Sequence, residues 1–327
     1  MRFTVTGATG FIGRAFVRRA LADGHTVRAL VRDPAVALPD AVERAVGDLT
    51  RPETLAPALR DAEAVVHLAA QLGDWGPEAA FVRANVEGTR AMLDAARSAC
   101  VGRFVFTSSL VVYGEHLLGA QPCDEDRPFG KKLVSAYARS KVAAERACQE
   151  TATATFAPTI VRPGNVFGPG SKFWVDEVVA ALRTSGVPVV DGQRPLAHLA
   201  YVDNVVDVLL RAALAPGAAG RAYNVNDAEG VTWWRYLRDM AAIAGAALPS
   251  KIMPGPAAAA IAAVMEATAR ALRRKKRPLL TRESVRLFRA RAPLPITRAE
   301  TELGHRPLVP YATAMERVRA YVARGVT

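Results

Sequence analysis

The chain has 327 residues, half of them hydrophobic, and its 43 lysines and arginines outnumber 31 acidic residues, giving a formal net charge of +12. This length suffices for a large core in one two-lobed domain or two domains. Cys100, Cys123 and Cys148 are too few for a disulfide framework and lack metal-ligand spacing, so they predict a reducing, cytoplasmic location. We see neither a secretory signal before Phe3 nor an apolar run of the roughly 20 residues that span a membrane. No nucleic-acid motif accompanies the positive charge, so we expect a solvated arginine-rich surface and no nucleic-acid partner.

Short β-branched runs alternate with helical stretches through the first half of the chain. The runs that predict strands are 3–6, 26–31, 64–67, 103–107 and 158–161, and the stretches that predict helices are 11–22, 78–99 and 135–150. Such alternation predicts right-handed crossovers and a parallel sheet covered by helices on both faces.

The pattern changes after about Gly164. Glycine and proline punctuate 163–170 and 186–195, residues 222–225 predict a strand that returns to the sheet, and the chain from 232 onward is mostly helical. We therefore assign 1–165 and roughly 200–226 to a sheet lobe. The remainder, 166–199 and 227–327, is assigned to a smaller, mostly helical lobe.

Residues 256–277 form an alanine-rich stretch that runs into a basic cluster. The stretch predicts one helix, for which two interpretations stay open. It either packs on the smaller lobe, with its cations placed at the negative end of the helix dipole, or it touches an anionic membrane surface peripherally.

A glycine-rich turn connects the first strand to the first helix. Its pattern allows a tight turn, close approach of a pyrophosphate and close packing of helix on strand, with free N–H groups at the helix start. Because the turn follows a strand and opens a helix, it predicts a dinucleotide site. The candidate residues in this turn are Gly7, Thr9, Gly10, Phe11, Ile12 and Gly13.

The second strand ends at Val31 without the carboxylate that would hold the adenine ribose hydroxyls, and Arg32 follows it. A guanidinium suits a 2′-phosphate, so we predict NADP(H) as the preferred cofactor, with NAD(H) as the alternative. Arg28 is a second candidate, because strand alternation places it on the same face. Asp48 either accepts from the adenine amino group or serves the turn that precedes Arg51.

Three residues point to acid–base chemistry on a carbonyl. Tyr137 and Lys141 lie four residues apart on a predicted helix and therefore share one face. A tyrosine with a pKa near 10 is a poor acid–base group at neutral pH, and we expect the lysine ammonium to lower that pKa. Ser109 follows the strand 103–107, at the strand end where ligands of α/β sheets bind.

These motifs resemble the extended short-chain dehydrogenase/reductase family, of the NAD-dependent epimerase/dehydratase type, over nearly the whole chain. The resemblance is carried by 6–13, 47–49, 67–70, 85–89, 107–109, 112–114, Tyr137 with Lys141, and 162–170. It implies a Rossmann-type doubly wound parallel sheet, a small-molecule substrate, a homodimer through the helices of 78–99 and 135–150, and a catalytic role for Ser109. The further positions that it implies at the cofactor are Leu49, Leu68, Ala69, Ala70, Asn85, Thr107, Ser108, Pro163, Gly164, Asn165 and Val166.

The branch of the family is indicated by other positions. Leu110 and Val111 stand where dehydratases of this family carry Asp-Glu, and Leu196 stands where epimerases carry the arginine that binds a diphosphate, although Arg194 is nearby. Stretches 73–76, 278–285 and 297–307 are similar to the 3β-hydroxysteroid dehydrogenase branch, which includes reductases of 2-alkyl-3-oxoacids. The resemblance therefore implies hydride transfer on a ketone or secondary alcohol of an apolar substrate.

Two alternative functions stay open, a sugar-nucleotide 4-epimerase with tightly bound NAD and a non-catalytic NADP sensor. The sensor is disfavoured because such proteins usually lose the Tyr–Lys pair. Aromatic residues Trp75, Phe173 and Trp174 either line a substrate pocket or belong to the core. The histidines do not cluster in the sequence, so we expect structural roles for them and no metal.

Overall fold

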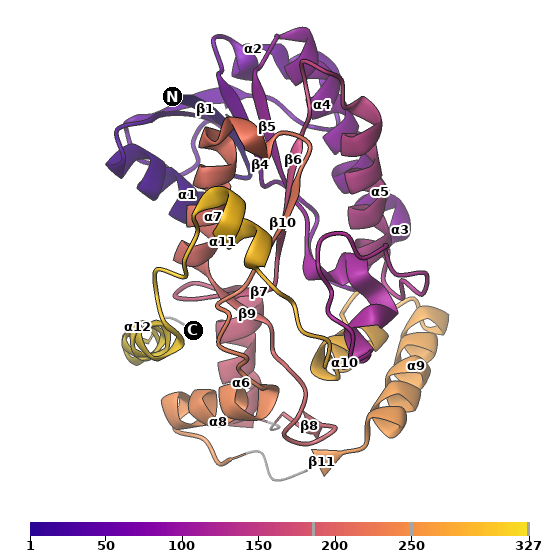
Figure 1. The fold of residues 1–327 in the computed structure, drawn as a ribbon. Coiled ribbons are helices and arrows are strands. Elements are labelled where there is room, and N and C mark those ends of the chain that lie inside the picture. Colours follow the sequence, from indigo (N-terminus) through magenta and orange to yellow (C-terminus); the bar gives the residue numbers. More distant parts are fainter. Residues whose placement is uncertain (185–186, 249–251, 326–327) are drawn as a thin grey trace.

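The computed structural model describes residues 1–184, 187–248 and 252–325. Within these residues, seven parallel strands form the central sheet in the order β10-β6-β5-β4-β1-β2-β3 (Figure 1). The strands are β1 (Arg2–Thr6), β2 (Thr26–Val31), β3 (Val42–Val46), β4 (Ala64–His67), β5 (Arg103–Thr107), β6 (Thr159–Pro163) and β10 (Ala222–Val225). The strand order reverses between β1 and β4, so the predicted doubly wound sheet is confirmed, and its switch point lies beside the glycine turn.

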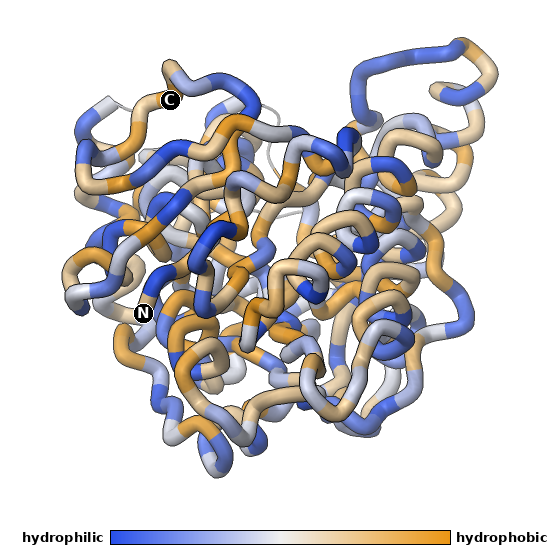
Figure 2. Tube along the Cα trace, turned by 90° about the horizontal axis from the view of Figure 1, so that it is seen from above, coloured by the Kyte–Doolittle hydropathy of each residue, from blue (hydrophilic) through white to orange (hydrophobic). Residues whose placement is uncertain are grey.

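Helices cover both faces of the sheet, as its fully buried strands require (Figure 1). One face packs against α1 (Phe11–Ala22) and α7 (Val202–Leu214), with α11 (Thr297–Leu303) and α12 (Tyr311–Ala323) completing that core. The other face packs against α2 (Ala56–Leu59), α4 (Gly88–Ser98) and α5 (Ala136–Thr151). Figure 2 shows hydrophobic segments through the interior and hydrophilic segments in many outer turns.

The predicted helix 78–99 is present but not regular. It consists of α3 (Glu78–Phe81), a π-helical stretch η2 (Val82–Glu87) and α4. The wider π turn holds Asn85, whose side chain is buried and bonded to neighbouring segments. A π segment inside an α-helix often marks a functional region, and here it lies beside the switch point.

Segments after β6 build a smaller region at the carboxyl end of the sheet. Its strands pair as β7 (Asn165–Phe167) with β9 (Leu199–Tyr201), and as β8 (Val189–Val190) with β11 (Ile252–Met253). Its helical elements are η4 (Lys172–Asp176), α6 (Glu177–Thr184), α8 (Trp233–Ala244), α9 (Gly255–Ala271) and α10 (Arg282–Phe288). The short helices η1 (Pro52–Thr54), η3 (Leu110–Leu118) and η5 (Pro216–Ala218) connect larger elements.

Helix α1 packs closely on the sheet because its backbone at Gly13 touches the backbone of the turn after β1. A Cβ built on Gly13 would lie 2.0 Å from the carbonyl oxygen of Gly7, so only glycine fits there. Gly7 itself has a φ of +68°, and its Cβ would lie 2.7 Å from the amide nitrogen of Ala69 at the end of β4. The expected roles of both glycines in the turn and in helix–strand packing are thus visible in the geometry.

Gly13→Ala should destabilise the fold by about 1–3 kcal/mol, because the added methyl group must push α1 away from the β1 turn. Gly217→Ala is the matched control, since its Cβ would meet nothing within 4 Å. Urea unfolding followed by far-UV circular dichroism measures both variants. Equal midpoints for Gly13→Ala and the unmodified protein would contradict the proposed contact.

Candidate active site

The glycine turn presents α1 with its first N–H groups open. Gly10 is the N-cap of α1, and it has no side chain to cap the helix. The turn is closed by a hydrogen bond of 2.9 Å from the Gly10 amide to the Gly7 carbonyl. The exposed N–H groups and the helix dipole together favour an anion such as a pyrophosphate.

Arg32 lies at the edge of the sheet directly after β2, and its side chain is exposed. In the described part of the chain it forms no ion pair, although its charge contributes to lowering the pKa of Asp48. Arg14 on α1 is close to the same edge, where its Nε donates to the Thr9 carbonyl at 2.8 Å. The sequence had not singled out Arg14.

The expectation for Arg28 is wrong. Its guanidinium is buried, lies 2.8 Å from a carboxylate oxygen of Glu43 and donates to the carbonyl of Arg60 beyond α2. Arg28 sits in the middle of β2 and is held by the layer of α2, so it does not reach the carboxyl edge of the sheet. The alternation of side chains along β2 correctly gave the face on which Arg28 lies. It could not show that α2 packs on that face and covers the guanidinium.

Asp48 performs the turn role that the sequence had left open. Its Oδ1 accepts from the amide of Thr50 at 2.8 Å and from the hydroxyl of Thr50 at 2.9 Å. The backbone hydrogen bond from Thr50 contributes most to holding the pKa of Asp48 below its usual value. A contact with adenine stays a prediction.

The structure brings Ser109, Tyr137 and Lys141 together at the carboxyl end of β5. The hydroxyl of Ser109 lies near that of Tyr137 and acts to lower the pKa of the phenol. Lys141 Nζ donates to the carbonyl of Thr107 at 2.7 Å and lies 5.8 Å from the centre of the Tyr137 ring. Residues Thr6, His67 and Phe106 are in register across β1, β4 and β5, so the glycine turn and the triad share one edge of the sheet.

The ionisation of the triad differs from the expectation. Burial raises the pKa of Tyr137 to about 12, and the nearby Ser109 hydroxyl opposes that rise. Burial also lowers the pKa of Lys141 to about 8. The lysine is turned to the Thr107 carbonyl, so the protein alone does not lower the pKa of Tyr137 and holds the phenol protonated.

A buried hydrogen-bond network supports the loop after β4, where Leu68, Ala69 and Ala70 lie. Asn85 accepts from the Gln71 amide at 2.7 Å and donates to the Ser140 hydroxyl at 2.9 Å, which ties this loop to α5. The side chain of Asn85 is therefore used in shaping the loop. His67 bonds to Thr6 and Thr89, and burial lowers its pKa to about 3, which fits the expected structural role.

The turn after β6 also depends on close backbone packing. A Cβ on Gly164 would lie 2.1 Å from the carbonyl oxygen of His198, which also accepts from the amide of Asn165 at 2.8 Å. The Asn165 side chain donates to the Ala197 carbonyl at 2.7 Å. His198 is buried, and this burial lowers its pKa to about 4, so a neutral ring packs behind the Pro163–Gly164 turn.

The carboxyl edge fits a dinucleotide on features of the chain itself. The glycine turn leaves no room for a Cβ at Gly7 or Gly13, and α1 starts without a side-chain cap. In the described part of the chain, Thr107 Oγ1 and Ser108 Oγ are buried without a hydrogen-bond partner. Buried hydroxyls of this kind usually have a partner, so their position beside the triad suits a polar ligand.

Comparison with known proteins identifies the family. The profile of the NAD dependent epimerase/dehydratase family matches residues 3–226. The chain belongs to this family. It is an NAD(P)-dependent oxidoreductase of the extended short-chain dehydrogenase/reductase type, as the sequence motifs had indicated.

Named relatives point to the predicted branch. The chain is 29% identical over 331 residues to a 2-alkyl-3-oxoalkanoate reductase of Shewanella oneidensis, covering 97% of this chain and 85% of the relative. It is 30% identical over 275 residues to a 3 beta-hydroxysteroid dehydrogenase/Delta 5-->4-isomerase of Mycobacterium tuberculosis, covering 78% and 73%. A crystal structure named gox2253 has a TM-score of 0.79 and 28% identity, covering 99% of this chain and 98% of that one.

The sequence had not indicated how this dehydrogenase/reductase fixes the helix that carries Tyr137 and Lys141. Glu145 on α5 and Arg162 on β6 form a buried ion pair, with 2.7 Å between Oε2 and Nη2. Arg162 also donates to the hydroxyl of Tyr113, which in turn donates to Asn224 on β10. The network thus joins the helix that carries Tyr137 and Lys141 to two strands.

A second contact joins the start of α5 to the smaller region. Ser135 caps α5, accepting from the amide of Ala138 at 3.0 Å, and its hydroxyl donates to Glu283 on α10 at 2.6 Å. Glu283 is buried, and its charge contributes to the raised pKa of Tyr137. In the sequence, Glu283 was indicated only through the similarity of stretch 278–285 to the 3β-hydroxysteroid dehydrogenase branch.

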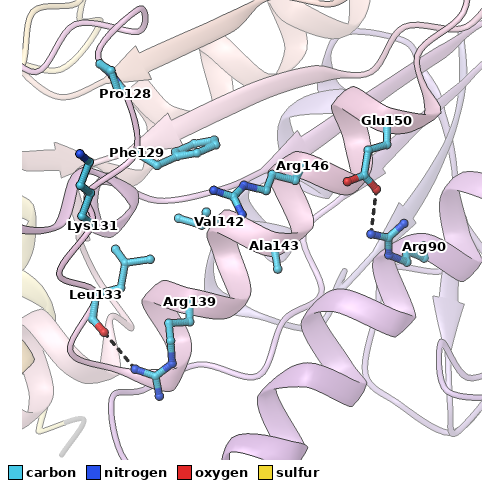
Figure 3. Close-up of a pocket in the computed structure, with 11 residues that line it drawn as sticks. Arg90, Pro128, Phe129, Lys131, Leu133, Arg139, Val142, Ala143, Arg146 and Glu150 are labelled. Carbon is cyan, nitrogen blue, oxygen red and sulfur yellow. Dashed lines mark hydrogen bonds and ion pairs between the residues drawn. The ribbon is translucent and has the colours of Figure 1, made fainter.

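A groove of about 880 Å³ lies on the side of α5 opposite Tyr137 and Lys141 (Figure 3). Phe129, Val142 and Ala143 give it an apolar floor, and the Arg90–Glu150 ion pair of 2.8 Å lies at one end. This groove is separate from the triad.

Metal ions and membrane-spanning helices were two features that the sequence did not predict. No group of three or more histidine, cysteine, aspartate or glutamate side chains lies close enough to hold a metal ion within these residues. No helix in the described ranges is both long and apolar enough to cross a membrane.

Glu145→Gln should lower the free energy of unfolding by about 3–5 kcal/mol, because it leaves the buried guanidinium of Arg162 without its counter-charge. Glu150→Gln is the matched control on the same helix. It removes an exposed pair and should change stability by less than about 1 kcal/mol. Denaturant titration of both variants gives the comparison, and equal effects would refute the special importance of the buried pair.

Proposed function

We propose that this protein is an NADP(H)-dependent reductase that transfers a hydride between nicotinamide and the ketone or secondary alcohol of an apolar substrate. The supporting observation is that Tyr137, with Ser109 nearby, lies beside the buried Lys141 on the sheet edge that carries the glycine turn. A bound nicotinamide cofactor supplies or accepts the hydride. The chain supplies the proton, the orientation and the exclusion of water.

Tyr137 is the proposed proton donor in reduction and proton acceptor in oxidation. Ser109 holds the substrate oxygen through its hydroxyl and stabilises charge that develops there. Lys141 uses one of its N–H donors on the Thr107 carbonyl, which leaves two donors for a ribose hydroxyl. Because burial raises the pKa of Tyr137 to about 12, the phenol carries at pH 7 the proton that reduction of a ketone consumes.

The surroundings of Tyr137 favour an apolar substrate. Leu110 and Val111, which replace the Asp-Glu of dehydratases, are both buried in an apolar cluster that includes Leu287 of α10. Trp174 packs against Trp233 with ring centres 5.3 Å apart and borders the same cluster. Leu196, at the position of the diphosphate-binding arginine of epimerases, is apolar and cannot neutralise a diphosphate, which leaves the exposed Arg194 as the alternative cation. We place the substrate among 2-alkyl-3-oxoacids and 3β-hydroxysteroids or the corresponding ketones, because the relatives named above are a 2-alkyl-3-oxoalkanoate reductase and a 3 beta-hydroxysteroid dehydrogenase.

The arrangement of lobes and subunits is part of the proposal. We assign cofactor binding to 1–165 with 200–226, and substrate binding to 166–199 with 227–327. A homodimer forms through the outer faces of α4 and α5, where the apolar floor of the groove in Figure 3 offers a contact surface. The cysteines of the described chain are all free thiols, which supports the proposed cytoplasmic location.

Tyr137→Phe should reduce kcat at least about 100-fold, since it removes the acid–base group. The cofactor dissociation constant should change by less than about a factor of ten, equivalent to about 1.4 kcal/mol. NADPH oxidation with a panel of 2-alkyl-3-oxoacids, steroid ketones and UDP-sugars measures the first quantity. Fluorescence titration with NADPH measures the second.

Tyr321→Phe is the control, because this tyrosine lies on α12, far from the triad in sequence and fold. In the unmodified enzyme, kcat for oxidation of the product alcohol should rise with pH, because only the deprotonated phenol accepts the proton. Unchanged turnover of Tyr137→Phe would refute the acid–base role. Tightly retained NAD with turnover of UDP-sugars alone would identify an epimerase instead.

Arg32→Gln should lower kcat/KM for NADPH by about 10–100-fold, as expected for the loss of charge-assisted hydrogen bonds to a 2′-phosphate. The same variant should leave kcat/KM for NADH nearly unchanged. Arg97→Gln, in an exposed pair with Asp94 on α4, is the control for a simple loss of surface charge. A preference of the unmodified enzyme for NADH would overturn the cofactor assignment.

A further inference from the structure

Helix α9 exposes an apolar face to solvent. Between Gly255 and Ala269 its only charged residue is Glu266, and that residue is buried. The residues that face inward are Gly255, Ala258, Ala262, Glu266 and Ala269. Helical periodicity places Ile261 and Val264 together on the opposite side, and they are 42% and 66% exposed. A surface helix normally turns charged and polar residues outward. In α9 the arrangement is reversed, because apolar side chains face the solvent and the charged Glu266 faces the protein.

Exposed apolar side chains concentrate around this helix. Among the described residues, six of the thirteen large apolar side chains that are exposed fall within 248–279. They are Leu248, Ile252, Ile261, Val264, Leu272 and Leu279. Isolated exposed apolar residues are ordinary, whereas such a concentration indicates a surface that is covered by something else. Figure 1 shows α9 at the periphery of the molecule, away from the central sheet.

A cationic turn follows the helix directly. Residues 273–277 are all basic and exposed. Arg277 pairs with Asp74 at 2.5 Å, and the indole Nε1 of Trp75 donates to the Arg274 carbonyl at 3.2 Å. These contacts fix the backbone of the turn against the 73–76 loop. Trp75 is half-buried and therefore not part of the core, while its role in lining a substrate pocket stays a prediction.

The remaining charges of the turn are available for a partner. Arg273, Arg274, Lys275 and Lys276 form no ion pair with any residue in the described ranges, whereas nearby Arg270 and Arg282 are satisfied by buried Glu266. Four cations without an ion-pair partner in the described chain therefore lie next to an exposed apolar helix, and a partner that covers this surface must match both features. Its partner must accept apolar side chains and carry negative charge.

We propose that α9 and the turn 272–279 form a membrane-docking surface that binds the face of an anionic lipid bilayer. Val264, Leu272 and their neighbours enter the boundary between headgroups and acyl chains, and the four cations contact lipid phosphates. A second copy of the chain is a poorer partner, because an isologous contact pairs this surface with itself and residues 255–279 contain no exposed acidic side chain to meet the four cations. The inference concerns binding alone and stands whether or not the proposed reaction is correct.

Vesicle sedimentation tests the surface with the full-length protein. Binding to vesicles in which roughly a third of the lipid is phosphatidylglycerol should exceed binding to pure phosphatidylcholine vesicles by about tenfold or more. Replacing Arg273, Arg274, Lys275 and Lys276 together by glutamine should remove this difference. Val264→Gln should weaken binding to the anionic vesicles while leaving the charge unchanged. Salt at about 1 M should release the protein, because it reduces the screening length to about 3 Å.

Matched variants separate docking from general charge or hydrophobicity. Glutamine at Arg97, Arg306, Arg319 and Arg324 removes the same four charges elsewhere, and Leu308→Gln removes an exposed apolar side chain outside the surface. Both controls should bind vesicles like the unmodified protein. Equal binding to neutral and anionic vesicles, or full binding by the quadruple glutamine variant of the turn, would overturn the proposal. So would light scattering showing that Val264→Gln dissolves a dimer without altering vesicle binding.

Discussion

The buried ion pair between Arg162 and Glu145 fixes helix α5 against the sheet, and the positions of the proposed catalytic groups Tyr137 and Lys141 depend on that helix. Lys141 is one turn before Glu145, and Tyr137 is one turn before Lys141, so the pair anchors a single helical face. At the start of the same helix, Ser135 joins Glu283. The helix is thus held from the sheet at one end and from the smaller region at the other.

These anchors explain why the tyrosine is hard to ionise in the protein itself. Tight packing of α5 on β5 buries both the phenol and the ammonium, and burial disfavours the charged form of each. The lysine compensates for its lost hydration with the Thr107 carbonyl. The site therefore keeps a proton on Tyr137 and holds the ammonium of Lys141 at the carboxyl end of β5.

Local patterns of the sequence sufficed for the framework. The predicted bounds 26–31, 64–67 and 103–107 coincide with β2, β4 and β5, because each strand is a compact apolar run between turn residues. The glycine turn and the Tyr-x-x-x-Lys spacing were readable for the same reason, since each is a short segment whose geometry is set locally.

Other features depend on residues far apart in the chain. Arg28 looked free from strand alternation, but α2 supplies the carbonyl that binds it. The pairing of Glu145 with Arg162 and that of Ser135 with Glu283 span 17 and 148 positions, so no local pattern indicates them. The expected lowering of the Tyr137 pKa by Lys141 was too large. Spacing on a helix does not reveal that the ammonium is bonded to the carbonyl of Thr107 on β5.

The late return of β10 to the sheet has a consequence for synthesis on the ribosome. β10 pairs with β6, yet about 60 residues separate the end of one strand from the start of the other. At typical elongation rates, translation of that stretch takes roughly 3–12 seconds. During this interval the nascent sheet has an open edge at β6, where it is exposed to wrong pairing with other chains. Chaperone contact at this stage would protect the side of the sheet that later holds Asn224 and the Arg162 network.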